Sequence, residues 1–201
     1  MDIANVYNNI ATDFSNTRYK IWFSISKFID TFKDTDLNAD IGCGNGKNML
    51  YKQLKFKGID ICDEFIKICK DRNLDVIKGN ILSIPFESEM FDNVLCIAVI
   101  HHLSSKEERI KAIKELFRIC KESGRIMIYI WALEQPIESK RQFKSQDEMV
   151  PYKKINGEVH YRYYHLYKER ELEEEVRLCG IPFKYMESGY ERGNWYVIIT
   201  K

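Results

Sequence analysis

The sequence predicts an α/β fold, a doubly wound and mostly parallel sheet of about seven strands with one antiparallel strand near an edge, preceded by N-terminal helices. Three observations predict it. Apolar runs of strand length alternate with amphipathic segments of helical period. Glycines at positions 42, 44 and 46 follow the first apolar run, as in a strand–turn–helix unit. Two closing apolar runs flank residues 191–194 and predict a hairpin that supplies the antiparallel strand.

The size and composition fit one globular domain, residues 1–201, with 45% hydrophobic residues, 30% charged residues and a net charge of +1. This balance excludes an overall basic field, so any RNA contact must come from a local patch. No apolar run is long enough to span a membrane and no signal-peptide pattern is present, which predicts a cytoplasmic protein, with a nuclear pool also open. Six cysteines without a C-x-x-C pair predict reduced thiols and no metal site.

Residues 1–36 are predicted to form a helical extension ahead of the first strand. Apolar side chains at helical spacing predict a helix over 3–14 after a cap at Asp2, and a second helix over about 20–32. A polar turn at residues 15–19 separates them. Such an extension either covers a site or only packs against the sheet, and the sequence leaves both open.

The glycine-rich turn has several possible interpretations. A Walker A loop fails, because Ile41 stands where its first glycine belongs and Asn48 where a Ser or Thr is needed. A dinucleotide fingerprint fails, because Gly46 comes one position early. The pattern from Asp40 to Gly46, D-x-G-x-G-x-G, instead resembles the first motif of class I S-adenosylmethionine-dependent methyltransferases. A plain glycine-rich surface turn is the remaining alternative.

Polar residues end three successive predicted strands at intervals of 20. Asp40 ends the strand over 37–41, Asp60 the strand over 55–60, and Asn80 follows the strand over 75–78. A helix is predicted between the first two strands, over 47–54. Because the carboxyl ends of parallel strands meet at one edge of a sheet, these residues are expected to face one ligand, with the Asp60 carboxylate accepting hydrogen bonds from ribose hydroxyls.

The second half of the chain continues the alternation. The longest apolar run, 91–100, predicts a buried central strand that ends at His101 and His102. Capping boxes at Ser104 and Ser105 predict a helix, and a fifth strand ends near Trp131. The remaining predicted segments are a long mobile loop over 134–158, a charged helix over 168–179, and hairpin strands over 183–190 and 195–200.

Segments along nearly the whole chain resemble one family, the tRNA wobble-uridine carboxymethyl methyltransferases, whose domain is fused in animals to an AlkB-like dioxygenase. The segment Trp-Ala-Leu-Glu-Gln at 131–135 and the double-histidine segment are the most specific. The other segments that carry the likeness are Val6-Tyr7, Ser15 to Tyr19, Asp40 to Gly46, Arg162 to His165, and Gly189-Tyr190 with Asn194-Trp195.

The resemblance implies methylation of the carboxylate of 5-carboxymethyluridine at the anticodon wobble position. The cofactor would be S-adenosyl-L-methionine, with S-adenosyl-L-homocysteine as product. It also implies a heterodimer with a small zinc-binding activator subunit, which would add a strand at the sheet edge near residues 74–78. Two departures from the wider methyltransferase pattern are Asn80, where many class I enzymes have Asp, and Glu122-Ser123-Gly124, where a Pro-Gly-Gly turn is commoner. An Asn carbonyl can still accept a hydrogen bond.

The motif spacing and the resemblance together assign site residues. The predicted cofactor-binding residues are Asp40, Gly42, Gly44, Asn45, Gly46, Asp60, Ile61, Asn80, Ile81 and Ile97. The predicted catalytic residues are Arg18, His101, His102 and Trp131, and the predicted substrate-binding residues are Arg18, Tyr19, Arg162, Tyr163 and His165. Because a carboxylic acid of pKa about 4 is ionised at neutral pH, no strong general base is needed. One of the adjacent histidines is expected to be structural, and His101 is the preferred substrate contact. The alternatives without a catalytic role are a surface ion pair for Arg18 and a position in the hydrophobic core for Trp131.

The stretch from Lys140 to Lys168 has seven basic against three acidic residues, interleaved with tyrosines, and predicts a local RNA-binding patch. Two other functions stay open. A class I methyltransferase acting on a small molecule would not need this patch, and an inactive cofactor-binding scaffold would not need the histidines. A dehydrogenase is disfavoured by the misplaced third glycine.

Overall fold

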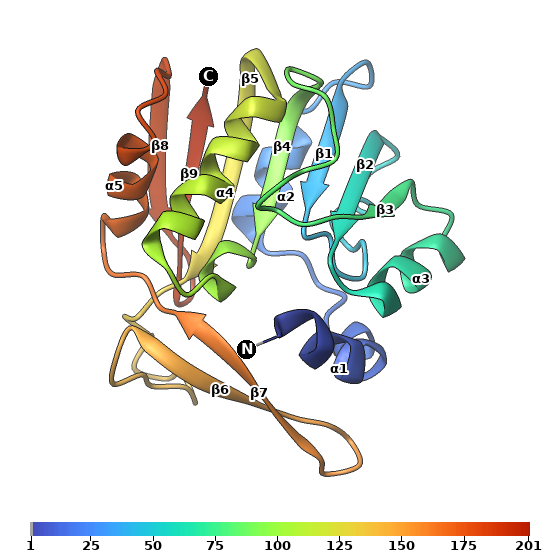
Figure 1. The fold of residues 1–201 in the computed structure, drawn as a ribbon, viewed down its shortest axis with the longest axis vertical. Helices are drawn as coiled ribbons and strands as arrows, with labels where there is room; N and C mark the ends of the chain where they lie inside the picture. The colour runs from blue at the N-terminus through green and yellow to red at the C-terminus, as the bar shows by residue number, and fades with distance from the viewer. Residues whose placement is uncertain (1) are drawn as a thin grey trace.

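The computed structural model describes residues 2–201, which form a seven-stranded sheet in the order β3-β2-β1-β4-β5-β9-β8 (Figure 1). Neighbouring strands are parallel except β9, which runs antiparallel to both β5 and β8. The predicted seven-stranded sheet with one antiparallel strand beside an edge is therefore confirmed. The strands are β1 (Leu37–Ile41), β2 (Lys55–Asp60), β3 (Val76–Lys78), β4 (Phe91–Ile97), β5 (Cys120–Trp131), β8 (Tyr185–Tyr190) and β9 (Asn194–Thr200).

Helices cover both faces of this sheet because the central strands are apolar on both sides. Alternate residues of β5 face opposite ways, so Ile126, Ile128 and Ile130 join the core with α4 and α5 while Met127 and Tyr129 join the core with α2 and α3. The main helices are α2 (Phe23–Asp30), α3 (Asp63–Asp71), α4 (Lys106–Ile119) and α5 (Glu171–Leu178), with a short 3-10 turn η1 (Ile100–His102) after β4. No helix within residues 2–201 is long and apolar enough to cross a membrane.

Two elements lie beyond the carboxyl ends of β1 and β4, at the bottom of Figure 1: helix α1 (Ile3–Thr17) and the hairpin β6 (Asp147–Lys153) with β7 (Val159–His165). Asp2 caps α1 by accepting from the backbone N–H groups of Ala4 and Asn5, as predicted. The hairpin is tied to α1, because the Asp13 carboxylate accepts from the Ile155 N–H at 2.9 Å. Together they build walls around the end of the sheet where a doubly wound fold places its ligand.

The structure corrects two predicted segments. Residues 47–54 form turns and bends rather than a helix, and the buried Asn48 side-chain amide donates to the Asp40 carboxylate. The predicted loop over 134–158 contains strand β6, in which Val150 and Tyr152 are buried on one face of the hairpin. Pro151 between them is tolerated because a strand of a two-stranded hairpin has one unpaired edge.

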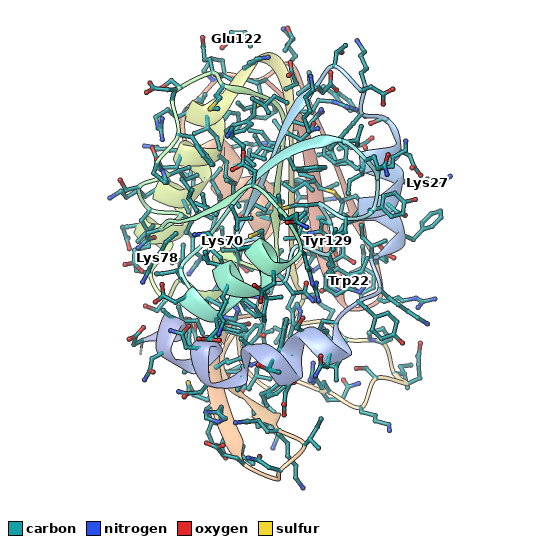
Figure 2. The ribbon with its side chains drawn as sticks, turned by 90° about the vertical axis from the view of Figure 1, so that its right-hand side faces the viewer. Trp22, Lys27, Lys70, Lys78, Glu122 and Tyr129 are labelled. Carbon is teal, nitrogen blue, oxygen red and sulfur yellow. The ribbon has the colours of Figure 1, made fainter. Side chains whose placement is uncertain are left out.

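Helix α2 begins at Phe23, three residues later than predicted, and its cap comes from the far end of the chain. The Glu191 carboxylate accepts from the N–H groups of Phe23 and Ser24 at 3.0 Å each. Trp22, just before the helix, stacks on Tyr129 of β5 with ring centroids 4.9 Å apart, and Figure 2 shows the two side by side. The chain between α1 and α2 is therefore fixed against the sheet.

Candidate active site

A cavity of about 560 Å³ lies at the carboxyl ends of β1, β2 and β4, with α1 and β7 forming its outer walls. Its volume is in the usual range for small-molecule sites. Many of the residues predicted from the sequence line it: Arg18, Gly42, Gly44, Asn45, Asp60, Ile61, Asn80, Ile81, Ile97, His102, Trp131 and Arg162. We call it the active-site cavity.

The glycine turn forms one wall and needs glycine for two different reasons. Gly42 has φ +75°, and a Cβ there would meet a Val99 methyl at 2.3 Å, so a side chain is excluded. Gly44 has φ +54°, and a Cβ there would have no atom of the described chain within 4 Å. Gly44 therefore presents bare backbone to the cavity, which lets a ligand approach closely.

Asp60 holds this turn from the tip of β2. Its Oδ2 accepts from the Gly44 N–H at 2.8 Å and its Oδ1 from the Cys62 N–H at 2.9 Å. Burial raises the pKa of Asp60 to about 6, although these backbone N–H groups oppose the rise. Each carboxylate oxygen keeps a free lone-pair site, so Asp60 can accept from a vicinal diol such as that of a ribose.

Asp40 lies beneath the turn rather than in the cavity. It is fully buried, and its Oδ2 accepts from the Asn48 amide at 3.2 Å. Burial raises the pKa of Asp40 to about 7. Gly46 also lies outside the cavity lining, against Leu74 and Cys69. Both residues, predicted to bind the cofactor, thus shape the turn from behind.

Asn45 joins the turn to the end of α1. Its Nδ2 donates to the carbonyl of Arg18 at 3.1 Å and lies 3.3 Å from the Ser15 hydroxyl. Arg72 donates to the Asn45 carbonyl at 2.7 Å and to the same hydroxyl at 3.2 Å. This partly buried network fixes the backbone at Arg18, so that the Arg18 side chain reaches the cavity from a rigid position.

His102 lines the cavity with a defined hydrogen-bond pattern. Its Nδ1 lies 2.8 Å from the Tyr163 carbonyl oxygen, which can only accept, so Nδ1 carries the proton. Its Nε2 then accepts from the Tyr7 hydroxyl at 2.9 Å. Burial lowers the pKa of His102 to about 4, so this ring is neutral at physiological pH.

His101, the preferred substrate contact in the sequence prediction, lies outside the cavity lining. It is fully buried, and its Nδ1 accepts from the Trp131 N–H at 3.1 Å. Burial lowers the pKa of His101 well below its ordinary value. The two histidines diverge because Ala98, at φ +60°, turns the chain out of β4 into the 3-10 turn. His101 thus supports Trp131 from behind, while His102 faces the cavity.

Arg162, on β7, is the least usual residue of the site. Only 2% of its surface is exposed, yet its Nε and Nη2 have no hydrogen-bond partner among residues 2–201, and it forms no ion pair with any of them. Its guanidinium carbon lies 5.2 Å from the Tyr164 ring centroid, 5.3 Å from that of Tyr152 and 5.9 Å from that of Tyr7. A permanent charge thus sits in an aromatic box at the cavity wall, stabilised mainly by ring faces.

Trp131 completes the wall beside this box. It stacks on Tyr164 with centroids 4.5 Å apart, and its carbonyl accepts from the Tyr167 N–H at 3.0 Å, where β7 rejoins β5. The sequence prediction named Trp131 but missed Tyr7 and Tyr164, both of which line the cavity. Tyr7 was visible only as part of the family likeness, and Tyr164 only as one of a row of tyrosines.

The other predicted substrate residues lie elsewhere. Tyr19 is 70% exposed on a neighbouring surface. Tyr163 bonds to Asp147, and His165 bonds through its two nitrogens to Asp147 and Glu171 at 3.0 and 2.8 Å. The predicted RNA patch over 140–168 is not one surface either, because the rings of Tyr164 and Tyr167 are buried and so cannot stack on RNA bases.

The fold, the glycine turn held by the strand-tip carboxylate, and the adjoining cavity define a class I S-adenosylmethionine-dependent methyltransferase. The model of a methyltransferase domain matches residues 39–128. The tRNA (carboxymethyluridine(34)-5-O)-methyltransferase of Schizosaccharomyces pombe is 36% identical over 99% of this chain and 96% of its own length. The chain belongs to the family of tRNA (carboxymethyluridine(34)-5-O)-methyltransferases.

Two further relatives are longer than this chain. The Xenopus tropicalis tRNA (carboxymethyluridine(34)-5-O)-methyltransferase alkbh8 is 32% identical over 99% of the chain, which covers 40% of the frog protein. The human probable tRNA methyltransferase 9B is 35% identical over 96% of the chain, which covers 39% of the human protein. The chain thus spans about two fifths of these two relatives.

Solved structures share the fold at low identity. A SAM-dependent methyltransferase of Methanosarcina mazei matches with a TM-score of 0.70 and 20% identity, over 90% of this chain and 98% of that one. A chain in the complex between the Haloferax volcanii Trm112 methyltransferase activator and a putative methyltransferase matches with a TM-score of 0.73 and 13% identity, over 99% of this chain and 97% of that one. These matches confirm the class I methyltransferase fold.

Proposed function

We propose that this chain transfers a methyl group to the carboxylate of 5-carboxymethyluridine at the wobble position of tRNA, giving the methyl ester. One observation carries the proposal: the buried guanidinium of Arg162 has no carboxylate partner within residues 2–201 and borders the cavity that the cofactor turn also lines. A buried charge without a partner is costly in a folded protein. An anionic substrate group would be the missing partner.

A nucleoside acetate supplies such a group without any help from a base. With an ordinary carboxyl pKa of about 4, it is ionised at neutral pH, and its oxygen is already the nucleophile. Arg162 would hold the carboxylate on the cavity side of the aromatic box, and Arg18 would add a second cation at the cavity rim. Because the substrate loses its charge as the ester forms, these arginines contribute to binding and alignment more than to lowering the barrier.

The residues present fit S-adenosylmethionine. Gly44 would give its backbone close approach, Asp60 would accept from the ribose hydroxyls, and Ile61, Asn80, Ile81 and Ile97 would surround the base. The Asn80 Oδ1 already accepts from the Leu82 N–H at 2.9 Å and keeps one lone-pair site for a ligand. Bound S-adenosylmethionine supplies an electrophilic methyl group on a sulfonium and leaves as S-adenosylhomocysteine.

The neutral polar residues of the site would orient the substrate and exclude water. His102 is held neutral between Tyr7 and the Tyr163 carbonyl, so it does not compete with Arg162 for the carboxylate. Trp131, whose backbone N–H donates to His101, would form part of the wall of the substrate site together with Tyr164, on which its ring stacks. The main contribution of the protein would therefore be to align the substrate carboxylate with the methyl group. This is expected for a displacement reaction in which the cofactor supplies the reactivity.

We also propose that a small activator subunit binds at β3. This strand is three residues long, lies at the edge of the sheet, and carries Ile77 with 40% of its surface exposed. An edge strand with an exposed apolar side chain is a template for strand addition by a partner. Figure 2 faces this edge of the sheet, and Lys70 of α3 and Lys78 of β3 are both seen at this edge.

The test is nucleoside mass spectrometry on tRNA that lacks the terminal ester. The chain is incubated with this tRNA and methyl-labelled cofactor, with and without the co-expressed activator. Appearance of the labelled methyl ester at the wobble uridine is the expected result. Label in another nucleoside, or transfer only to small acids, would refute the proposal.

The proposed edge is tested by co-purification of the co-expressed activator with Ile77→Arg, with Leu178→Arg as the matched control. Leu178 is 55% exposed on α5, away from β3. We expect Ile77→Arg to lose co-purification with the activator and Leu178→Arg to keep it. Equal co-purification would exclude the β3 edge.

A further inference from the structure

A second cavity, of about 470 Å³, adjoins the active-site cavity and shares with it the residues Arg18, Trp22, Lys47 and Trp131. We call it the basic cavity. Its charged lining consists of Arg18, Lys20, Lys47, Arg141 and Arg192, and no acidic side chain of the described chain lines it. A cavity with five cations and no carboxylate is an anion site by its charge.

None of these five cations forms an ion pair within residues 2–201. Lys47 is held in place by donating to the Lys20 carbonyl at 3.2 Å, and its Nζ lies 4.5 Å from the Trp22 ring centroid. Arg141 lies over the Trp131 ring, 4.9 Å from its centroid. The positive charge is therefore carried on fixed aromatic walls, and it is not neutralised by the protein itself.

The acid next to Arg192 in the sequence is turned away from the basic cavity. Glu191, directly before Arg192, gives its carboxylate to the N–H groups at the start of α2. Asn194, which lines the cavity, donates from Nδ2 to the carbonyls of Glu191 and Arg192 and so fixes the turn that presents Arg192. The shape of this turn keeps a cation in the cavity and its neighbouring carboxylate out of it.

The cations also act on one another. Burial lowers the pKa of Arg141, and the charges of Arg162 and Arg18 lower it further. Burial lowers the pKa of Lys47, and Arg18 again adds to the effect although Asp40 opposes it. Mutual repulsion of this kind is relieved when a polyanion binds, because each phosphate neutralises cations that otherwise destabilise one another.

We propose that the basic cavity binds the RNA backbone at the nucleotide next to the methylated one, with Tyr19 stacking on the neighbouring base. The inference rests on the proposed function. If the target base enters the active-site cavity, its own chain must leave across the shared wall of Arg18, Trp22, Lys47 and Trp131. Phosphate contacts from lysine and arginine, with an exposed aromatic ring beside them, are the usual features of single-stranded RNA sites. Tyr19, 70% exposed at the rim, supplies that ring.

The test compares two triple variants of equal charge change in the full chain with its activator. Lys20→Gln, Arg141→Gln and Arg192→Gln together remove cations found in the basic cavity and absent from the active-site cavity. Lys111→Gln, Lys114→Gln and Arg177→Gln remove exposed cations from α4 and α5, on the opposite side of the sheet. Affinity for undermodified tRNA is measured over a range of salt concentrations, with cofactor affinity and turnover at saturating tRNA measured in parallel.

For the cavity variant we expect tRNA affinity to fall by roughly tenfold to a hundredfold and the salt slope to decrease by about two to three, one per lost phosphate contact. Turnover at saturating tRNA and cofactor affinity should stay near wild type, and the α4–α5 variant should behave as wild type throughout. Unchanged affinity and slope in the cavity variant, or equal losses in both variants, would overturn the inference while the wild type still forms the ester. A wild-type chain that transfers no methyl group to this tRNA would overturn the proposed function itself, and with it the inference.

Discussion

Arg109 and Arg162 are both arginines with almost no exposed surface, 4% and 2%, but their surroundings differ. Arg109, on α4, pairs with the buried Glu175 of α5 at 2.8 Å, and Tyr167 donates to the other oxygen of that carboxylate at 2.8 Å. Arg162 forms no ion pair in residues 2–201, and two of its nitrogens have no hydrogen-bond partner there. Tyrosine side chains, including the Tyr7 hydroxyl, surround its guanidinium. The charge of Arg109 is paired within the fold, whereas the charge of Arg162 has no ion pair in residues 2–201. The difference is the basis for our proposal that Arg162 serves a ligand and Arg109 the fold.

The largest effect on stability is expected at Arg109, whose charge is paired with Glu175. Arg109→Met leaves the Glu175 carboxylate buried without its cation, which should lower the free energy of unfolding by about 3–5 kcal/mol. Thermal or urea denaturation measures the loss. Adding Glu175→Gln removes the stranded charge, keeps an acceptor for Tyr167, and should recover about 2 kcal/mol of the loss. Equal stability of Arg109→Met and wild type would remove the contrast between the two arginines.

Arg162→Met should act in the opposite direction. It removes an unpartnered buried charge and leaves an apolar side chain among the same rings, so the free energy of unfolding should rise by about 1–2 kcal/mol after allowing for the lost cation–π contacts. The same denaturation experiment measures it, and cofactor binding by calorimetry verifies that the site is intact. A loss of stability as large as that of Arg109→Met would make Arg162 a structural residue.

A smaller effect concerns Asp60 and pH. With the pKa of Asp60 at about 6, protonation below that pH occupies a lone-pair site that the ribose diol needs. Cofactor affinity should therefore be full above pH 6 and fall by about tenfold per pH unit well below it. In Asp60→Asn the affinity should be lower and lack this dependence. Parallel pH profiles in the wild type and the variant would exclude Asp60 as the titrating group.

Much of the fold could be predicted because its signals are local. The apolar runs placed the strands, and the spacing of 20 residues between Asp40, Asp60 and Asn80 predicted that three strand ends meet. The incorrect secondary-structure predictions lie where a contact with a residue distant in sequence determines the local structure. Residues 47–54 are turns, with the buried Asn48 hydrogen-bonded to Asp40, and α2 is capped by Glu191, about 170 residues away in the chain. The Pro151 in β6 suggested a loop, because sequence does not show that one edge of this strand stays unpaired.

The sequence predicted many of the residues that line the active-site cavity, but not the role of each residue there. Arg18, Trp131 and Arg162 could be named as residues, yet only the tertiary structure reveals that Arg162 is buried without an ion pair in the described chain. Two adjacent histidines are equivalent in sequence. The left-handed conformation of Ala98 before them decides that His102 faces the cavity and His101 the back of Trp131. A residue's function here depends on which neighbours are missing, and sequence patterns do not report that.

The most direct measurement determines whether Arg162 recognises the negative charge of the substrate. The affinity of the wild type and of Arg162→Met is measured for two tRNAs that differ only at the wobble base, one with the carboxymethyl group and one with the neutral carbamoylmethyl group. We expect the wild type to prefer the carboxylate by about thirtyfold or more, since losing a buried charge pair costs about 2–5 kcal/mol, and Arg162→Met to show almost no preference. The same preference in both proteins would show that Arg162 does not recognise the carboxylate.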